Sequence, residues 1–413
     1  MQKPSHASGG KPELLFVSPE APYPTVGGGA LRTASLLEFL AGQFSIHLIL
    51  FAEEGSPDPA LAVPAGLVCR VTTLRLPPHS KTLPARMARN ATRYIRSRPP
   101  LMDRFSGFDG QLSELLAGSS YAAAIIEHFW CAPYVDVLRP HCAEVWLDLH
   151  NVESVWHQRL SQTEDWMFRP LLKGFAAACR SLEQEFLPKF SRILVPSCDD
   201  ALELAAAAAG VPVVIYPNAL PWVDLPVVPK DEAIIFTGNL EYAPNVRAVC
   251  WFSRQIWPQI RRWRPELVWR IVGKNPRGVR RYVSGDRRVE LIGPVEDAIA
   301  EIARAKVAVV PVFAGSGTRY KIIEAWAAGT AVVSTTIGAE GLGAEHERNI
   351  LLADSPEQMN KAIVALLESD SLRAGIAAAG RERYQERFTW AAAWRALESS
   401  GGPGSHTEKR TLY

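Results

Sequence analysis

Short apolar runs alternate with helix-like segments along most of the chain. The runs of the first half lie at 14–18, 46–51, 122–127, 145–149, 192–196 and 213–217, and those of the second half at 233–238, 267–273, 289–293, 307–312 and 331–335. Apolar residues recur at helical spacing over 30–40, and helices are also expected near 246–261, 295–304 and 318–328. Runs this continuous predict strands of a parallel sheet that is covered by helices on both faces.

A proline-rich segment, 218–230, separates the two series of runs. We therefore predict an α/β fold class, with two doubly wound, Rossmann-like domains facing a central cleft. The length of 413 residues agrees with this, because it suits two domains of about 200 residues each. Ligands of such sheets bind beyond the carboxyl ends of the strands.

Composition narrows the class of protein. A formal net charge of +2 argues against a general nucleic-acid binder. The six cysteines form no CxxC pair, so we expect reduced thiols in a cytoplasmic, reducing compartment and no zinc site. No apolar run reaches the about 18 residues of a spanning helix. Residues 1–12 lack the apolar core of a secretory signal, and they and 401–413 are expected to be flexible.

The most informative motif is VAVVPVFAGSGTRYKIIEAWAAGTAVVST, residues 307–335. It predicts a strand, a glycine-rich turn with Ser316, Gly317 and Thr318, and a short helix. The N–H groups and partial positive charge of a helix N-terminus suit a phosphate, and Arg319 and Lys321 add formal charge there. Glu324, one turn further on, needs a polar partner such as a sugar hydroxyl. The alternative is an ordinary strand–turn–helix unit, but such a helix would favour acidic residues at its start.

Polar motifs also follow three predicted strands of the first half. Three glycines, among them Gly28 and Gly29, follow the first strand and allow close approach of a ligand, unless they form only a surface turn. The other two strands are followed by possible proton-transfer and hydrogen-bonding groups, which are Glu127, His128, His150, Asn151 and Glu153. A lone histidine is more often structural, but two such clusters at neighbouring strand ends favour a cleft. No nucleophile–base pair or metal-ligand spacing stands out, so we expect no required metal.

The segment 81–104 is strongly basic. It carries Lys81, Arg86, Arg89, Arg93, Arg96, Arg98 and Arg104 against a single acid, Asp103. Apolar residues lie between the basic ones, which is typical of a helix that rests on an anionic membrane surface. A solvated helix face is the alternative.

The chain resembles the family 4 glycosyltransferases, which have the two-domain GT-B fold, over about residues 14–398. The motifs that carry the resemblance occur in the family's order: PYPTVGGGALRTASLLEFLA, IIEHFW, LDLHNVES and YPNA, then FTGNLEYAPN, WRIVGKNP, IGPVEDAIAEIARAKVAVVP and GSGTRYKIIEAWAAGTAVVSTTIGAEGL. The resemblance implies an acceptor-binding domain over 1–220, a nucleotide-sugar-binding domain over 221–388 and a terminal helix over 389–400 that crosses back. It also implies metal-independent, hexosyltransferase-like transfer with retention of configuration and no cofactor.

The same resemblance assigns roles to single residues. Glu324 matches the ribose-binding glutamate, His128 the histidine that contacts the transferred sugar, and Gly28 and Gly29 the loop that faces the diphosphate. Gly293, Pro294 and Val295 match the loop that meets the base.

Two positions depart from the family pattern. Ser316 stands where the family has a first glutamate, which leaves the identity of the donor sugar open. Asn239, after Gly238, replaces the arginine that normally holds the diphosphate, and no lysine follows it. We therefore expect Arg319 and Lys321 to supply the missing cations. The GSGTR-x-K-x-x-E form resembles a branch found in bacterial polysaccharide gene clusters.

The expected partners are a nucleotide-sugar donor, a glycan or lipid-linked acceptor, and an anionic membrane surface on the cytoplasmic side. Two alternatives remain at this point. Some nucleotide-sugar 2-epimerases share the GT-B fold, and a chain with a degraded site would be a binding or scaffold partner.

Overall fold

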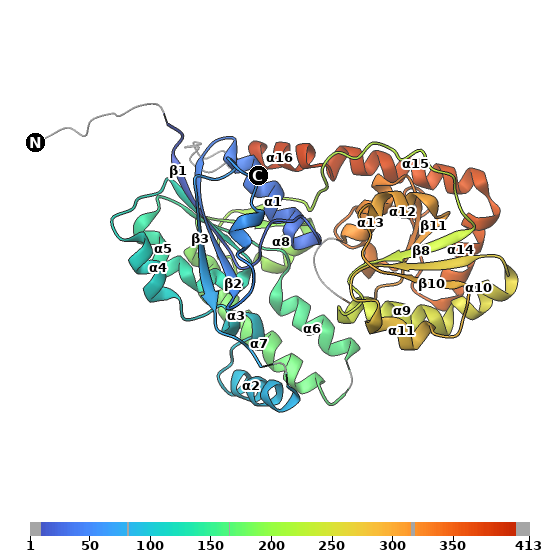
Figure 1. The fold of residues 1–413 in the computed structure, drawn as a ribbon, viewed down its shortest axis with the longest axis horizontal. Helices are drawn as coiled ribbons and strands as arrows, with labels where there is room; N and C mark the ends of the chain where they lie inside the picture. Colours follow the sequence, from blue (N-terminus) through green and yellow to red (C-terminus); the bar gives the residue numbers. More distant parts are fainter. Residues whose placement is uncertain (1–9, 81, 165, 315–318, 402–413) are drawn as a thin grey trace, which may run out of the picture.

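The computed structural model describes residues 10–80, 82–164, 166–314 and 319–401 of the 413-residue chain. Within them the chain forms two parallel β-sheets that are covered by helices (Figure 1). Lys81 and the turn residues Ser316, Gly317 and Thr318 lie outside the described residues.

The first sheet has seven parallel strands in the order β3-β2-β1-β4-β5-β6-β7. Their bounds are β1 Glu13–Ser18, β2 Ser45–Glu53, β3 Arg70–Leu76, β4 Ala123–Glu127, β5 Val145–Asp148, β6 Arg192–Val195 and β7 Val213–Ile215. The helices of this domain are α1 Gly28–Ala41, α2 Leu83–Ile95, α3 Pro100–Arg104, α4 Asp109–Leu116, α5 Val135–Leu138, α6 Glu153–Thr163, α7 Arg169–Phe186 and α8 Cys198–Leu204. Buried apolar clusters lie on both faces of the sheet, as continuous apolar strands predict.

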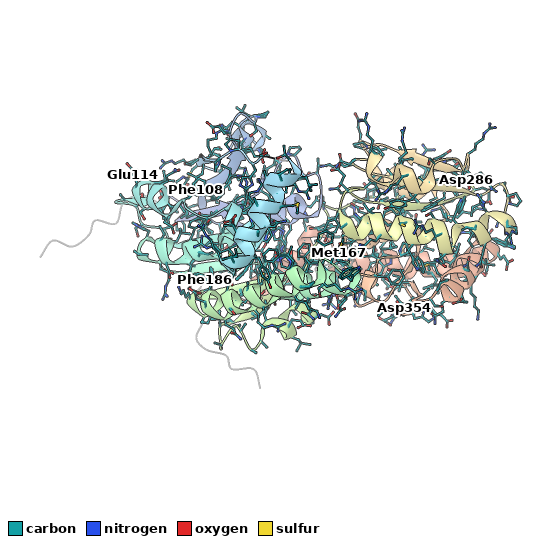
Figure 2. All side chains as sticks on the ribbon, turned by 90° about the horizontal axis from the view of Figure 1, so that it is seen from below. Phe108, Glu114, Met167, Phe186, Asp286 and Asp354 are labelled. Carbon is teal, nitrogen blue, oxygen red and sulfur yellow. The ribbon has the colours of Figure 1, made fainter. Side chains whose placement is uncertain are left out.

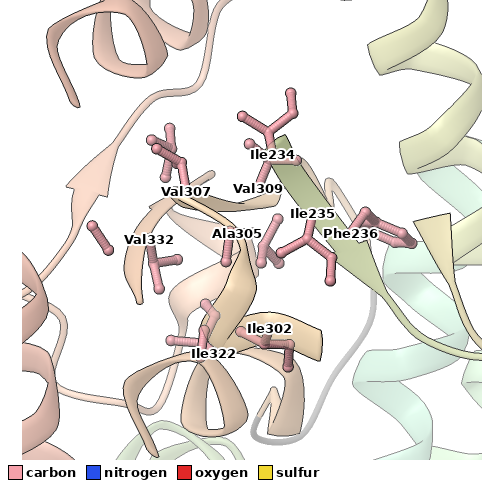
Figure 3. Close-up of a cluster of buried hydrophobic side chains, with 14 of the residues drawn as sticks. Ile234, Ile235, Phe236, Ile302, Ala305, Val307, Val309, Ile322 and Val332 are labelled. Atoms are coloured by element: carbon pink, nitrogen blue, oxygen red, sulfur yellow. The ribbon is translucent and has the colours of Figure 1, made fainter. Parts of the chain in front are cut away.

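The second sheet has six parallel strands in the order β10-β9-β8-β11-β12-β13. Their bounds are β8 Ala233–Thr237, β9 Val268–Val272, β10 Val289–Ile292, β11 Val307–Val310, β12 Ala331–Ser334 and β13 Leu351–Leu352. The helices are α9 Ala243–Gln255, α10 Trp257–Trp263, α11 Arg277–Val283, α12 Ala298–Arg304, α13 Tyr320–Ala327, α14 Pro356–Glu368 and α15 Asp370–Arg387. Figure 3 shows part of its core, where side chains of β8 and β11 pack with Ile302 and Ile322 from two helices.

The last helix, α16 (Trp390–Ser399), returns to the first domain, and Figure 1 shows it following α15 along one side of the molecule. Ala393 and Leu397 are fully buried in the cluster on one face of the first sheet, and the Trp394 indole donates to the Ser35 carbonyl at 3.0 Å. Where the chain crosses, the Leu220 N–H donates to Phe388 and the Trp390 N–H donates to Leu220. The two crossing segments are thus paired like short strands.

The two domains also touch through side chains. Arg247 of α9 pairs with Glu164 at 2.6 Å, and the Trp156 indole donates to the Tyr242 hydroxyl at 3.1 Å. None of the helices in the described part of the chain is both long and apolar enough to cross a bilayer. The six cysteines are all free thiols.

Candidate active site

The carboxyl ends of β4 and β5 bring two polar motifs of the first domain together. The strands pair with Glu127 opposite Asp148, and the His128 N–H donates to the Asp148 carbonyl at 2.9 Å. His128 adopts a φ of 62°, a left-handed conformation that is uncommon for a residue other than glycine. Strained backbone of this kind clusters at functional sites. The predicted neighbourhood of Glu127, His128 and His150 is therefore present.

The His128 ring lies between two other rings. It stacks on Trp130 with centroids 4.0 Å apart and meets His150 at 3.7 Å. Burial lowers the pKa of His128 well below its usual value, and the neighbouring His150 and Arg32 lower it further. Within the described residues His128 Nε2 has no hydrogen-bond partner, and Glu20 Oε2 is 3.7 Å away. A neutral imidazole held this rigidly can exchange a hydrogen bond with a substrate hydroxyl.

A buried ionic network lies next to His128 and His150. Arg32 of α1 pairs with both carboxylate oxygens of Asp148, with Nε 2.8 Å from Oδ2. Its Nη1 also donates to the Tyr216 carbonyl at 2.6 Å and to Asn218 Oδ1 at 3.0 Å. Both charged side chains are inaccessible to solvent, with 1% of the Arg32 side chain and 0% of the Asp148 side chain exposed. Through these bonds Arg32 connects α1 to β5 and to the segment that follows β7.

Glu127 is fully buried, so it reaches the cleft only through His150. Its Oε2 accepts from the Thr33 hydroxyl at 3.0 Å and lies 2.5 Å from His150 Nε2. Burial raises the pKa of Glu127 to about 8 and lowers the pKa of His150 to about 4. Burial therefore favours the neutral form of each group, and the bond from Glu127 fixes the orientation of the His150 ring.

These groups could also be considered as metal ligands. Ligand atoms of Glu127, His128 and His150 lie within 4.8 Å of one another, although the sequence showed no metal-ligand spacing. Two of the three already share a 2.5 Å hydrogen bond, and metal binding would have to break it. The chemistry of this donor set fits a hydrogen-bonded cluster better than a ready cation site.

Asn151 and Glu153, the other two acceptor-side candidates, bond to each other at the start of α6. Glu153 Oε1 accepts from Asn151 Nδ2 at 2.9 Å and from the Trp130 indole at 2.8 Å. The position is favourable for a carboxylate because a helix N-terminus carries partial positive charge. Burial nevertheless raises the pKa of Glu153 to about 7. Through Trp130, this carboxyl group also braces the His128 ring.

The first turn of α13 carries the cationic candidates of the second domain. Arg319 occupies the N-cap position of the helix and is buried, while Lys321 Nζ donates to Asn245 Oδ1 at 3.1 Å. Asn245 Nδ2 in turn donates to the Asn239 carbonyl at 2.9 Å. Burial and nearby Arg319 lower the pKa of Lys321 to about 8. Lys321 is thus linked through Asn245 to the Gly238–Asn239 turn. This is the turn that lacks the arginine and lysine of the family pattern.

Glu324 follows on the same helix face, and burial raises its pKa while Lys321 lowers it. Gly238 has a φ of 148°, and a Cβ there would lie 2.8 Å from Asn245 Nδ2. Pro294 and Val295 follow β10, so they lie at the same strand-end edge of the second sheet as Gly238. The predicted donor-binding residues Ser316, Gly317 and Thr318 lie outside the described residues.

Gly28 and Gly29 begin α1 and face different neighbours. A Cβ on Gly28 would lie 2.4 Å from the ring of Tyr320, so here the close approach is made by a side chain of the other domain. A Cβ on Gly29 would lie 3.0 Å from Glu20 Oε2 and 3.6 Å from His150. The glycine loop therefore lies between the histidine cluster and the first residue of α13.

Several site residues were missed in the sequence. Glu20 could have been found, because it follows the first strand by two positions, as the other candidates follow theirs. Arg32, Thr33 and Tyr320 carry no local signal, since their partners come from distant segments.

The chain is similar to several known proteins. Residues 231–369 match the family described as glycosyl transferases group 1. The chain is 21% identical to an uncharacterized 44.6 kDa protein in the cps region of Klebsiella pneumoniae, over 85% of this chain and 90% of that protein. It is 31% identical to a phosphatidyl-myo-inositol mannosyltransferase of Mycolicibacterium smegmatis, over 34% of this chain and 39% of the relative.

Solved structures show the same fold at low identity. Sucrose-phosphate synthase from Thermosynechococcus elongatus superposes with a TM-score of 0.72 at 18% identity, covering 94% of this chain and 98% of that one. TarM from S. aureus gives 0.67 at 10% identity, covering 94% and 99%. Residues 231–369 thus match a glycosyltransferase family and the whole chain has the GT-B fold, and together they support the family 4-like glycosyltransferase that the resemblance of the motifs predicted.

Proposed function

We propose that this glycosyltransferase moves a hexosyl group from a nucleotide-sugar to a glycan or lipid-linked acceptor, with retention of configuration and without a metal. The observation that carries the proposal is the start of α13, where the buried Arg319 precedes the half-buried Lys321, and Lys321 is linked through Asn245 to the Gly238–Asn239 turn. The cps-region name of one relative supports a role in bacterial surface polysaccharide synthesis. Structural neighbours support the donor class, since the HepE protein of Anabaena was solved with UDP-glucose.

The residues divide the work between the two domains. Negative charge develops on the diphosphate as it leaves, and fixed cations stabilise that charge without having to reorganise. Arg319 and Lys321 take this role, while Glu324 accepts hydrogen bonds from the ribose. His128 contacts the transferred sugar as a neutral imidazole. Closure of the two domains around the donor excludes water and favours transfer over hydrolysis.

A panel of nucleotide-sugars tests the proposal. Slow release of free nucleotide from one donor, without any acceptor, is the expected result. A new sugar isomer would instead identify a nucleotide-sugar 2-epimerase. Binding of a nucleotide with neither product would identify a binding or scaffold partner.

Replacing Glu324 by alanine should weaken binding of the cognate nucleotide by about tenfold to a hundredfold. The change removes hydrogen bonds to a charged acceptor, each of which contributes about 1.5–3 kcal/mol. Titration calorimetry measures the effect, with Glu368→Ala, at the exposed end of α14, as the matched control. An unchanged dissociation constant in Glu324→Ala would refute the ribose assignment.

The basic segment 81–104 is proposed to contact an anionic membrane surface on the cytoplasmic side. It forms α2 and α3, and α2 has no buried residue. Leu83, Met87 and Ile95 are exposed on α2 beside the basic side chains. Arg93 is engaged within the protein, because its Nε pairs with Asp103 at 2.8 Å. The arginines available to lipid are therefore Arg86, Arg96 and Arg98, together with the partly buried Arg89.

Changing Arg86, Arg96 and Arg98 to glutamine should abolish most binding to vesicles that contain anionic lipid. Each basic residue near such a surface contributes about 1 kcal/mol, so three changes correspond to a loss of roughly a hundredfold. Co-sedimentation measures the bound fraction, which should also fall as salt is raised. The control exchanges three exposed arginines of the second domain, Arg262, Arg280 and Arg287. Equal binding by both triple variants would assign the membrane contact to another surface.

A further inference from the structure

An apolar pocket of about 220 Å³ lies next to the histidine cluster in the first domain. Its roof is the α2–α3 segment, including Pro99 and Leu101, and its floor comes from α6 and α7. The apolar walls include Leu171, Leu172, Phe175 and Cys179 of α7. For scale, an apolar cavity of about 150 Å³ is large enough to bind benzene. The pocket is therefore large enough for a short hydrocarbon segment.

The roof rests on the floor through a close ring contact. Tyr94 of α2 packs on Gly174 of α7, where a Cβ would lie 2.4 Å from the tyrosine ring. The Tyr94 ring also meets Phe175 edge-on at 6.5 Å. The basic helix α2 is thus attached directly above the pocket, so the positive charge of α2 lies next to an apolar cavity.

Three polar side chains, Asn90, Glu153 and His157, interrupt the apolar lining. His157 is 4% exposed, and its Nδ1 has no hydrogen-bond partner among the described residues. Burial lowers the pKa of His157 to about 4, so the ring is neutral. Glu153 lines the wall nearest the cleft and bonds to the Trp130 indole at 2.8 Å. A buried ring nitrogen without a partner is costly unless a ligand satisfies it.

Trp130 connects the pocket to the active site. It lines the pocket, and its ring stacks on His128 at 4.0 Å. A single aromatic side chain, Trp130, therefore lies between the pocket and the His128 ring. Because they share the Trp130 side chain, the pocket and the histidine cluster are neighbouring parts of one site.

We propose that this pocket binds the apolar chain of a lipid-linked acceptor next to its anionic head group, and so presents the acceptor sugar to His128. The inference rests on the proposed function and commits it to the lipid-linked class of acceptor. Apolar walls suit the chain, the arginines of α2 suit a phosphate, and the N–H of His157 Nδ1, in the tautomer that carries it, donates a hydrogen bond to an oxygen of the head group. A polar glycan without a lipid does not match this combination of an apolar cavity and neighbouring positive charge.

Three exposed apolar residues precede α7, whose first turn supplies Leu171 and Leu172 to the pocket lining. Trp166, Met167 and Phe168 are 76%, 63% and 49% exposed just before α7 begins. Figure 2 shows Met167 at the end of the first domain that faces the second. Apolar side chains at this position provide a place where the rest of a long chain leaves the pocket for a bilayer.

The test uses farnesyl phosphate and decyl phosphate as probes, which share an apolar chain and a phosphate but differ in branching. Leu172→Trp fills the pocket and should weaken binding of a probe at least about tenfold by calorimetry. Leu182→Trp is the matched control, because Leu182 is an equally half-buried leucine of the same helix outside this pocket. Cys179→Met adds less volume at a fully buried wall position, and serves if the tryptophan variant does not fold.

Preference for farnesyl phosphate indicates an isoprenoid acceptor, and equal binding indicates any long-chain phosphate. The proposal is overturned if inorganic phosphate competes as well as either probe, or if Leu172→Trp and the control bind alike. Donor hydrolysis measured on the same variants separates the two levels. If the wild-type protein hydrolyses the donor but binds neither probe, the lipid-binding role of the pocket is refuted and the proposed transferase activity stands. If the wild-type protein does not hydrolyse any donor, the proposed transferase activity is refuted.

Discussion

Replacing Lys321 by alanine should lower turnover of the cognate nucleotide-sugar by about a hundredfold to a thousandfold, with a smaller loss of donor affinity. The same size of effect is expected for Arg319→Ala, because both cations act on the charge of the leaving diphosphate. The double variant should lose less than the product of the two single losses, since neighbouring groups that act on one charge are not additive. Steady-state kinetics and thermal melts on the three variants measure this.

A pH profile gives a second, independent measure of the role of Lys321. Burial lowers its pKa to about 8, so the free enzyme loses this charge as the pH rises through 8. The ratio kcat/KM, which reports the free enzyme, should fall in that range. Lys321→Arg keeps its charge and should remove the fall. Lys361→Ala, on the exposed side of α14, is the control. Normal turnover in the double alanine variant would place the diphosphate elsewhere.

Breaking the ion pair of Arg32 and Asp148 should destabilise the protein by about 3–5 kcal/mol. Arg32→Met leaves the carboxylate of Asp148 buried without its cation, and water cannot reach it. The double variant Arg32→Met, Asp148→Leu should recover much of the loss, because apolar side chains of similar size can replace a buried pair. Urea unfolding measures the free energies. Lys189→Met breaks a partly exposed pair with Asp136 and should change little. A negligible cost in Arg32→Met would show that the pair does not hold the site together.

The sequence predicted the parts of the fold that depend on local pattern. Continuous apolar runs gave the central strands of both sheets, and the polar residues after β4 and β5 gave the histidine cluster. The strand β3 was missed because RVTTLRL mixes polar and apolar residues at the edge of its sheet. The helix α11 was missed for a similar reason, since it has only Val279 buried.

The supporting contacts of the site could not be predicted in the same way. Arg32 and Asp148 are 116 positions apart, and their meeting depends on the register of strands that lie between them. Tyr320 contacts Gly28 across the two domains, so neither position has a local signal for the other. The position of Lys321 behind Asn239 was inferred only from a missing family cation, and the contact through Asn245 supports it.

The return of α16 to the first domain also fixes the order in which the protein can be completed during synthesis. The first domain needs Ala393 and Leu397 for one of its two buried clusters, yet these residues are made after the strands of the second domain. Ribosomes add about 5–20 residues per second, so roughly 10–30 s separate Leu220 from Trp390. Through that interval the emerging first domain carries an open apolar groove beside Leu36 and Phe39. A nascent chain of this kind is a natural client for chaperones that shield apolar surface until translation ends.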